Sequence, residues 1–399
     1  MRTNRNQLER IRKECLLALS GREAPTDAEL SLLIDEKIEK AAEDVRISLS
    51  ERLRLREMLF NSFKKLDLLQ ELIDDPKVTE IMINGKDRVF LEDDTGIHRW
   101  NGSFESEEKL ENIIRQIVGR VNRRVNTSEP IVDARLPKAG SRVHVVLPPV
   151  SLEGPTVTIR KFPEPVTMEK LMAWGSVTKE AADFLKTMIR ARYNLFVSGG
   201  TSSGKTTLLN ALSAYIPAEE RIITIEDSAE LQITHIPNLV RLETRDANAE
   251  GQGRIDMSML LKAALRMRPD RIIVGEVRDR SAIDMLTAFD TGHDGSLSTG
   301  HANSCRDMLL RLESMVLSGV DMPLDAVKRQ IASAVDLLVH LERQPDRSRK
   351  VMEIAEVDGM KNGEIVLHTL FSFDREKGRL VRTGTLRHPE KLMRAGITL

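Results

Sequence analysis

The sequence predicts an α/β protein in which two α/β domains follow a helical N-terminal extension. Apolar residues recur at helical spacing over residues 1–65. Short apolar runs separated by turns fill residues 66–162, and apolar strands alternate with helices over residues 179–399. The last pattern is typical of a mostly parallel sheet covered by helices. A chain of 399 residues is also long enough to bury more than one hydrophobic core.

The first 65 residues are predicted to be helical because Gly21 and Pro25 are the only glycine and proline among them. Their apolar residues form two stripes at helical spacing: Leu30, Leu33, Ile34, Ile38 and Ala41 in the first, and Leu55, Leu59 and Phe63 in the second. We expect these stripes to pack against partner helices rather than to lie on a membrane.

The second region predicts a small α/β domain. Its strand-like apolar runs are residues 78–83, 89–91, 143–147 and 157–159. Residues 107–121 have the pattern of a helix, and Asn84-Gly85 is a hairpin-type turn. Two prolines that flank Glu164 predict a linker over residues 163–178.

The third region predicts a parallel sheet that is extended by antiparallel strands. Strand-like runs occupy residues 195–198, 222–225, 239–243 and 272–274, and helical patterns occupy residues 205–214 and 257–267. Alternation of strands and helices in this order favours parallel pairing. Three later runs, residues 337–341, 351–357 and 365–373, are interpreted as an antiparallel meander added to that sheet.

Composition excludes several classes of protein. The chain has 60 basic and 61 acidic side chains, so no net charge draws it to nucleic acid or to an anionic membrane. Cys15 and Cys305 are far apart and belong to no CxxC pair, which favours free thiols in a reducing compartment. Neither a signal peptide nor a run of about 18 apolar residues is found. We therefore expect a cytoplasmic protein.

The clearest chemical signal is a complete G-x-x-x-x-G-K-[ST] motif, Walker A, which follows an apolar strand and opens a helix. Backbone N–H groups in such a loop converge on phosphate, and the helix dipole adds partial positive charge. Lys205 would reach the β and γ phosphates, and the Thr206 hydroxyl would bind Mg²⁺. The predicted nucleotide-binding residues are Gly199, Gly200, Thr201, Ser202, Ser203, Gly204, Lys205, Thr206 and Thr207.

Acidic residues follow the apolar strand predicted at residues 222–225. Glu226 and Asp227 come directly after it, and Glu230 lies one turn further on. Ligands of parallel sheets bind at the carboxyl edge of the strands, so these acids are expected to face the phosphates. The alternative is a solvated acidic turn.

Two further candidate site residues lie just after predicted apolar strands. The run at 271–274 is followed by Gly275 and Glu276, so a glycine stands where the Walker B motif usually has aspartate, and the carboxylate comes one residue later. His301 lies in the hydroxyl-rich run Gly295-Ser-Leu-Ser-Thr-Gly-His-Ala-Asn-Ser. It is interpreted as a sensor of the γ-phosphate, with a structural histidine as the alternative.

Together and in this order, GGTSSGKTT, TIEDSAEL, RPDRIIVGEVRD and GSLSTGHANS resemble the Walker A, Asp box, atypical Walker B and His box of the type II/IV secretion and pilus ATPase superfamily. The flanking segments PIVDARLPKAGSRVHVVLPP, GPTVTIRKF and LETRDANAEGQGRIDMSMLLKAALRMRPDRIIVGEVR resemble its Flp/Tad pilus assembly branch, which is CpaF/TadA-like. The resemblance covers residues 66 to 373. One departure is Ser202, where the family commonly has a second glycine; as a free position of the motif, it is expected to tolerate serine.

The resemblance implies a RecA-like ATPase domain behind a PAS-like α/β domain, with ATP held between the two domains of a homohexamer. It also implies Mg²⁺ at Thr206 and Glu276. The implied partners are inner-membrane platform proteins of a pilus or secretion system, at the cytoplasmic face of the membrane, and no specific nucleic acid. The motor would hydrolyse ATP to power pilus assembly or secretion.

The resemblance also assigns roles to single residues. Glu226 is similar to the residue that orients the attacking water, with Glu230 as the alternative, and His301 is similar to the His-box contact to phosphate. Arginines in the matched segments of the N-terminal domain would reach the γ-phosphate when the domains close, and Arg278 is a further candidate because it follows Glu276 so closely. The arginines in those segments, each of which could instead form a surface ion pair, are Arg135, Arg142 and Arg160.

Three other classes of protein fit the sequence less well. A DNA-processing ATPase would need aromatic residues for base stacking, yet only 4% of the chain is aromatic. A non-catalytic ATP-binding scaffold would not need both acidic boxes and the His box. A GTPase would carry an N-K-x-D string, which this sequence lacks.

Overall fold

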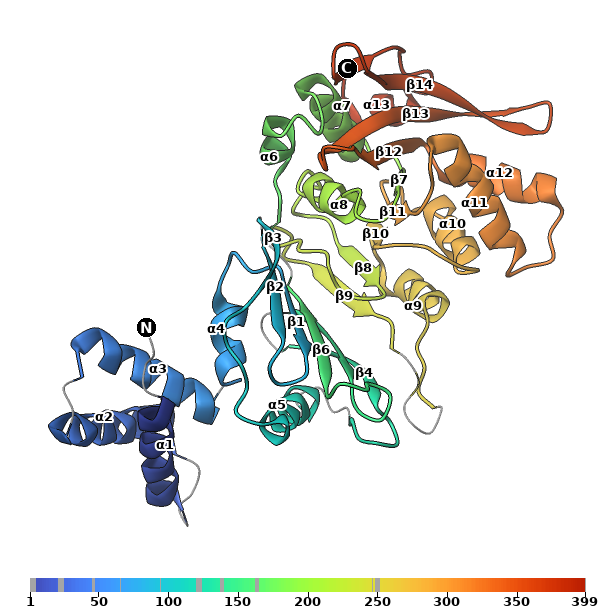
Figure 1. Cartoon of the computed structure of the whole chain (residues 1–399). Coiled ribbons are helices and arrows are strands. Elements are labelled where there is room, and N and C mark those ends of the chain that lie inside the picture. Colours follow the sequence, from blue (N-terminus) through green and yellow to red (C-terminus); the bar gives the residue numbers. More distant parts are fainter. Residues whose placement is uncertain are drawn as a thin grey trace. The chain divides into compact units, whose positions relative to one another are not determined.

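The computed structural model divides into two compact units, residues 1–163 and residues 164–399 (Figure 1). Separate hydrophobic cores stabilise them. The structure describes residues 5–20, 25–44, 47–64, 66–93, 95–119, 124–136, 140–161, 165–245, 247 and 252–398.

The described residues of the N-terminal extension form three helices: α1 (Arg5–Leu19), α2 (Asp27–Asp44) and α3 (Leu49–Lys64). A capping box starts α2, because the Thr26 hydroxyl accepts from the Glu29 N–H at 3.3 Å and the Glu29 carboxylate accepts from the Thr26 N–H at 2.8 Å. The predicted stripes pack against each other, which confirms the expectation of partner helices. The buried residues of this core include Ile11, Cys15, Leu30, Ile34, Ile38, Leu55 and Leu59.

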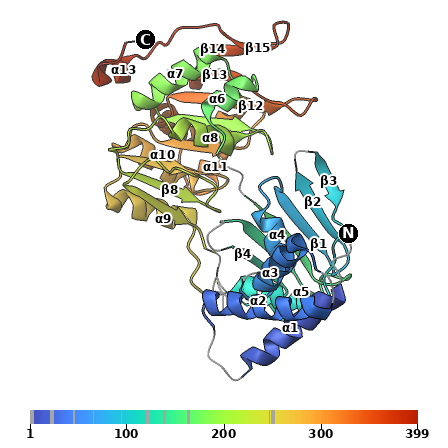
Figure 2. The ribbon, with the colours of Figure 1, turned by 90° about the vertical axis from the view of Figure 1, so that its left-hand side faces the viewer.

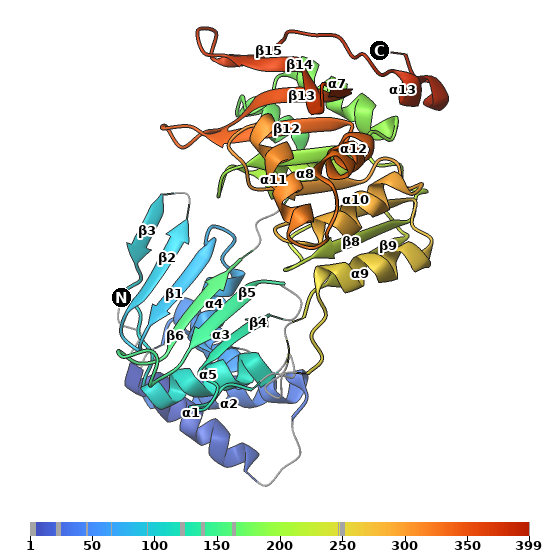
Figure 3. The same ribbon diagram turned by 90° about the vertical axis from the view of Figure 1, so that its right-hand side faces the viewer.

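Six antiparallel strands form the sheet of the N-terminal unit, in the order β3-β2-β1-β6-β5-β4. They are β1 (Glu80–Asn84), β2 (Val89–Asp93), β3 (Gly96–Arg99), β4 (Ile131–Arg135), β5 (Arg142–Val146) and β6 (Thr156–Arg160). The buried residues of these strands form one hydrophobic core with side chains of α4 (Leu68–Asp74) and α5 (Glu107–Gly119). Figure 2 shows α4 on one face of this sheet, and Figure 3 views the opposite face. The sheet is therefore apolar on one face and polar on the other.

Most of the predicted elements of this unit are confirmed. The hairpin at Asn84-Gly85 joins β1 to β2, and Gly85 has the positive φ of +73° that such a turn requires. The helix predicted at residues 107–121 is present to Gly119, and its last two predicted residues lie outside the described ones. β3, β4 and α4 were not predicted, because they are short and partly polar.

Nine strands form the sheet of the C-terminal unit, in the order β15-β14-β13-β12-β7-β11-β10-β8-β9. The six from β12 to β9 are parallel, and β13, β14 and β15 add antiparallel strands, as predicted. They are β7 (Leu195–Gly199), β8 (Ile222–Glu226), β9 (Leu239–Glu243), β10 (Arg271–Val274), β11 (Leu297–Gly300), β12 (Leu337–Arg343), β13 (Arg349–Lys361), β14 (Glu364–Asp374) and β15 (Arg379–Arg382).

Helices cover this sheet and form two apolar clusters with it. One cluster includes side chains of α6, α7, α8 and α13, and the other includes side chains of α9, α10, α11 and α12. Central strands are consequently buried along their whole length. The helices are α6 (Met168–Ala173), α7 (Lys179–Arg190), α8 (Lys205–Ser213), α9 (Met257–Ala264), the 3₁₀ turn Leu265–Met267, α10 (Ala282–Asp290), α11 (Cys305–Leu317), α12 (Leu324–Ala334) and α13 (Glu390–Ala395).

The predicted linker, residues 163–178, requires a correction. Within it, α6 buries Met168 and Leu171 in the core of the C-terminal unit. The two prolines correctly indicated the boundary between the units. The predicted linker was too long because α6, a helix of only 6 residues, was not recognised within it. Residues 165–178 are therefore part of the C-terminal unit. Pro163 and Glu164 lie outside the described residues.

Two expectations from composition can be compared with the structure. Cys15 and Cys305 are buried free thiols, as expected. Among the described residues, no helix combines the length and the apolar character that a membrane span requires.

Candidate nucleotide-binding site

The Walker A residues span the end of β7, the loop that follows it and the start of α8. Gly199 ends β7, and Lys205, Thr206 and Thr207 begin α8. A Cβ atom at Gly199 would lie 2.5 Å from both the Leu341 carbonyl oxygen and the Ser203 hydroxyl, so only glycine fits there. Gly204 has a φ of +95° directly before the first residue of α8, a conformation that glycine adopts without strain. The two glycines of the motif are thus required for different reasons: close approach at the first and backbone conformation at the second.

Ser202 also has a positive φ, +59°, although it is not glycine. Left-handed backbone costs a residue with a side chain roughly 1–2 kcal/mol. Serine at this position of the motif therefore carries a backbone cost that glycine would not. Nε of Arg349, the first residue of β13, donates to the Ser202 carbonyl oxygen at 3.0 Å.

Lys205 and His301, which are 96 residues apart, meet at this loop. Lys205 Nζ donates to the Gly200 carbonyl oxygen at 3.0 Å and lies 3.3 Å from His301 Nδ1. Because an ammonium group can only donate, Nδ1 is the acceptor and the proton of the neutral ring is on Nε2. Burial lowers the pKa of both groups, and the Lys205 charge lowers that of His301 further.

Glu276 extends this chain of contacts. His301 Nε2 lies 3.0 Å from Glu276 Oε1. Arg278 donates two hydrogen bonds to the same carboxylate, from Nε at 2.9 Å and from Nη2 at 3.2 Å. The hydrogen bond to Glu276 raises the pKa of Arg278. Lys205, His301, Glu276 and Arg278, predicted from three separate motifs, therefore form one continuous cluster.

Glu226 is turned inward rather than exposed. Its side chain is 2% accessible, and Oε2 accepts from the N–H groups of Glu230 and Leu231 at 2.7 and 2.9 Å. Oε1 is buried with no hydrogen-bond partner among the described residues. Burial raises the pKa of Glu226 to about 7, against the lowering effect of the two backbone N–H groups. In this structure Glu226 organises the turn that follows β8.

The same side chain accounts for the unusual glycine in the Walker B strand. A Cβ atom at Gly275 would lie 2.9 Å from Glu226 Cγ. The Glu226 side chain at the end of β8 thus already occupies the space that an aspartate side chain at position 275 would need. Glu230, the alternative to Glu226, takes part through its backbone: its N–H donates to Glu226 and its carbonyl oxygen lies 3.5 Å from Asn210 Nδ2.

The three arginines predicted to reach the γ-phosphate lie in one row across the sheet of the N-terminal unit. Arg135 is directly opposite Arg142 on the neighbouring strand, and Arg142 is directly opposite Arg160. Arg142 contacts Asp133 at 3.4 Å, and His144 contacts the same carboxylate at 3.1 Å. The row concentrates positive charge at one end of the polar face of this sheet.

The residues present fit a magnesium–nucleotide complex rather than a free metal ion. Among the described residues, no group of three or more His, Cys, Asp or Glu side chains could hold a metal. Mg²⁺ in nucleotide sites takes one or two protein oxygens and several from phosphate and water, a requirement that Thr206 and Glu276 could meet. The loop glycines leave room for phosphate, and Ser203 Oγ is buried without a partner among the described residues.

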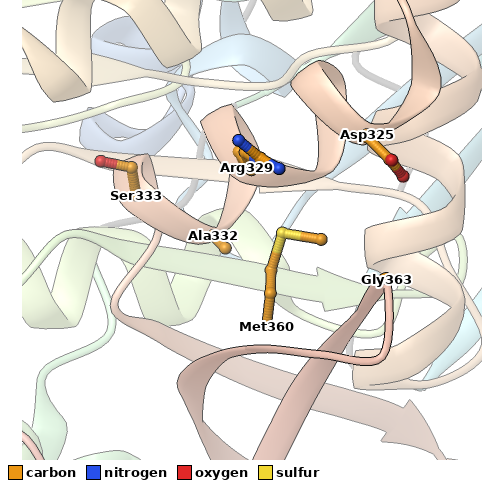
Figure 4. Close-up of a pocket in the computed structure, with 6 residues that line it drawn as sticks. All are labelled: Asp325, Arg329, Ala332, Ser333, Met360 and Gly363. Carbon is orange, nitrogen blue, oxygen red and sulfur yellow. The ribbon is translucent and has the colours of Figure 1, made fainter.

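Two pockets formed by described residues of the C-terminal unit can be compared with the predicted site. One of about 360 Å³ adjoins the Walker A loop and is lined by Gly200, Thr201, His301, Ala302, Asn303, Asp307 and Arg311. The other, of about 450 Å³, lies between α12 and the end of β13 with the turn that follows it, where Figure 4 shows Arg329 of α12 and Met360 of β13. Only the first contains the predicted phosphate-binding residues.

Two arginines beside the Walker A loop, Arg311 and Arg349, were not predicted. Arg311 lies on α11 four residues after Asp307, so helical spacing after the His box is the signal that would have indicated it. Arg349 carries no local signal, because its contact depends on the pairing of β12 with both β7 and β13.

Comparison with known proteins gives consistent results. The family of type II/IV secretion system proteins matches residues 62–385. A Mycobacterium tuberculosis protein whose name assigns it to conjugal transfer is 36% identical over 315 residues, covering 77% of this chain and 88% of the relative. The type IV secretion system protein VirB11 of Brucella suis is 33% identical over 305 residues, covering 69% and 84%.

Among solved structures, the pilus retraction motor PilT with bound ADP aligns with a TM-score of 0.53 at 19% identity, covering 83% of this chain and 87% of the other. This likeness concerns the fold. It confirms the predicted class, an N-terminal α/β domain followed by a RecA-like domain.

Proposed function

The chain belongs to the family of type II/IV secretion system proteins and is an ATPase, and we propose that it hydrolyses ATP at the Walker A loop to drive a Flp/Tad-type pilus or a related secretion system. The observation that carries this proposal is the cluster of Lys205, His301 and Glu276, which joins three motifs at the mouth of one loop. Lys205 and His301 are suited to contact phosphate, and Glu276 is suited to hold Mg²⁺.

Within this site we assign a separate task to each group. Lys205 binds the phosphates with the N–H groups of the loop, and Thr206 with Glu276 would hold Mg²⁺, which neutralises phosphate charge when bound. Glu226 orients the attacking water, with Glu230 as the alternative. For Glu226 this role requires its side chain to leave the inward position in which it accepts from two backbone N–H groups.

We further propose that the active form is a homohexamer at the cytoplasmic face of the inner membrane, where platform proteins of the pilus or secretion system are its partners. The arginine row of the N-terminal sheet would supply charge to the γ-phosphate. Turnover per chain is then expected to rise with protein concentration, because an isolated chain lacks the complete site. Light scattering coupled to ATPase assays would test this, and a fully active monomer would contradict it.

Conjugal transfer is the second candidate. It is favoured by the relatives named for conjugal transfer and type IV secretion. The pilus assignment is favoured by the segments PIVDARLPKAGSRVHVVLPP and GPTVTIRKF, which resemble the Flp/Tad branch.

One experiment separates the two candidates. The gene is deleted in its source organism and restored with the wild type or with Lys205→Ala, and surface pili and plasmid transfer are both measured. Loss of pili with normal plasmid transfer supports the pilus motor, whereas the reverse result supports conjugal transfer.

A second experiment tests the assigned chemistry. Glu226→Gln is expected to keep nucleotide binding and to lower turnover by roughly 10²-fold, the scale expected for loss of a positioned base. Unchanged steady-state turnover would move the assignment to Glu230.

A further inference from the structure

The hairpin of β12 and β13 lies against the Walker A loop at three points. The Leu341 carbonyl oxygen approaches Gly199, and the side-chain stem of Arg349 passes Gly204, where a Cβ atom would lie 3.3 Å from Arg349 Cδ. Between them, Arg349 Nε donates to the Ser202 carbonyl oxygen at 3.0 Å. Each contact is made with the backbone of the loop, the part of a Walker A motif that binds phosphate.

This hairpin is itself held in place. The Gln344 N–H donates to the Ser348 carbonyl oxygen at 2.8 Å and closes the turn. At the start of β13, Lys350 Nζ donates to the Gly175 carbonyl oxygen at 2.8 Å, and the Val351 N–H donates to the Ser176 carbonyl oxygen at 2.9 Å. Arg349 therefore projects from a strand with little freedom to shift.

Arg349 contacts Ser202, the one residue of the loop that has a left-handed backbone and is not glycine. Ser202 has a φ of +59°, and a serine is expected to leave this conformation more readily than a glycine. If Ser202 relaxed to a negative φ, the peptide groups on both sides would rotate, and the N–H groups that point at phosphate would no longer converge.

We propose that Arg349 is a positioning residue for ATP: its guanidinium holds Ser202 left-handed, so that the phosphate-binding loop is formed before the nucleotide arrives. The inference rests on the proposed nucleotide site at the Walker A loop. Arg349 acts through Ser202 and not through contact with the phosphates. Its importance thus follows from serine at position 202, and a glycine there would make it dispensable.

The test is a double-mutant cycle in the full chain, with ADP affinity measured by calorimetry and with KM and kcat measured for ATP. Arg349→Ala is expected to weaken ADP binding roughly fivefold to tenfold, which corresponds to about 1 to 1.4 kcal/mol. KM should rise by a similar factor, and kcat should change by less than about twofold. Ser202→Gly alone should bind ADP within about twofold of wild type, and adding Arg349→Ala to Ser202→Gly should cost less than about twofold.

Two control variants make the outcomes distinct. Arg343→Ala removes an exposed arginine that lies opposite Arg349 in the same hairpin, and it should leave ADP affinity unchanged. Lys205→Ala should abolish ADP binding; normal binding by this variant would overturn the nucleotide site itself.

If Lys205→Ala fails to bind ADP, the nucleotide site is supported. Three results would then overturn only the proposed role of Arg349. One is wild-type affinity in Arg349→Ala. Another is an equal loss with and without Ser202→Gly, which means that the arginine contacts the nucleotide directly. The third is a matching loss in Arg343→Ala, which means that only the charge of the hairpin matters.

Discussion

The sheets of the two units bury their strands differently. In the N-terminal sheet, β5 and β6 alternate exposed and buried residues, whereas every residue of β7 and β8 in the C-terminal sheet is buried. A strand that is buried on both faces can offer polar groups only where it ends, which is where the Walker A loop and Glu226 lie. A half-exposed strand can also present charged side chains on its open face, as β4, β5 and β6 do in the arginine row that crosses them. The proposed phosphate site and the arginine row thus belong to sheets that differ in burial.

The largest expected effect tests whether the C-terminal sheet carries nucleotide binding by itself. Lys205→Ala should lower ATP turnover on the order of a thousandfold, because the loop loses the cation at its centre. Steady-state ATPase assays and ADP titration would measure this loss. Lys262→Ala, which removes an exposed lysine on α9, is the matched control and should behave as wild type. Retained binding in Lys205→Ala would contradict the role of the C-terminal sheet.

A pH experiment compares buried carboxylates in the two sheets. Burial raises the pKa of Glu226 from 4.5 to about 7, so the folded chain binds this proton more tightly than the unfolded chain. The stability that the group contributes is therefore full below about pH 4.5 and is lost as the pH rises to 7, by about 3 kcal/mol. Glu226→Gln cannot ionise, so its melting temperature relative to wild type should increase from pH 5 to pH 8.

Glu80→Gln is the control for that experiment in the N-terminal sheet. Burial and the neighbouring Glu92 raise the pKa of Glu80, but Arg160 opposes the shift and the side chain is only partly buried. Its pH-dependent change in melting temperature should be clearly smaller. Equal changes in the two variants, or none in Glu226→Gln, would show that the sheets do not differ in this way.

A smaller effect tests whether the N-terminal sheet takes part in catalysis. At least one of Arg135→Ala, Arg142→Ala and Arg160→Ala should lower ATP hydrolysis about tenfold and leave ADP affinity unchanged, because ADP lacks the γ-phosphate. Arg99→Ala, an exposed arginine on β3 of the same sheet, is the control. If all three variants hydrolyse ATP within about twofold of wild type, Arg278 becomes the leading candidate for the γ-phosphate contact.

The smallest effect concerns packing at the end of β10. Gly275→Ala should destabilise the protein by about 1 kcal/mol, because its Cβ meets Glu226 Cγ at 2.9 Å. The loss should shrink when Glu226→Ala removes that atom. Gly119→Ala, at the end of α5 with open space around it, should be neutral in the same thermal unfolding assay. A Gly275→Ala protein as stable as wild type would mean that Glu226 does not fill this space.

Local patterns predicted the parts of the fold and of the site that depend on local sequence. Apolar runs located β7, β8 and β10, and the Walker A spacing located the loop before Lys205. The short, partly polar strands β3 and β4 were missed because their pairing, rather than their own residues, stabilises them.

Contacts between distant segments could not be predicted. The motifs supplied Lys205, His301 and Glu276 as separate residues, but their order in one cluster depends on how β7, β11 and β10 lie beside each other. The inward position of Glu226 likewise depends on a glycine 49 positions later, directly after the neighbouring strand β10. Sequence spacing cannot specify such a relation.

The contacts of α6 and of the turn that follows it determine where the C-terminal unit can be cut from the chain. A fragment beginning at Lys179 would lack Met168 and Leu171, and it would uncover the apolar surface that they occupy. It would also leave the Lys350 ammonium and the Val351 N–H without the carbonyl oxygens of Gly175 and Ser176. A fragment that begins at Pro165 retains all of these contacts. Expression of the ATPase unit alone should therefore start near residue 165.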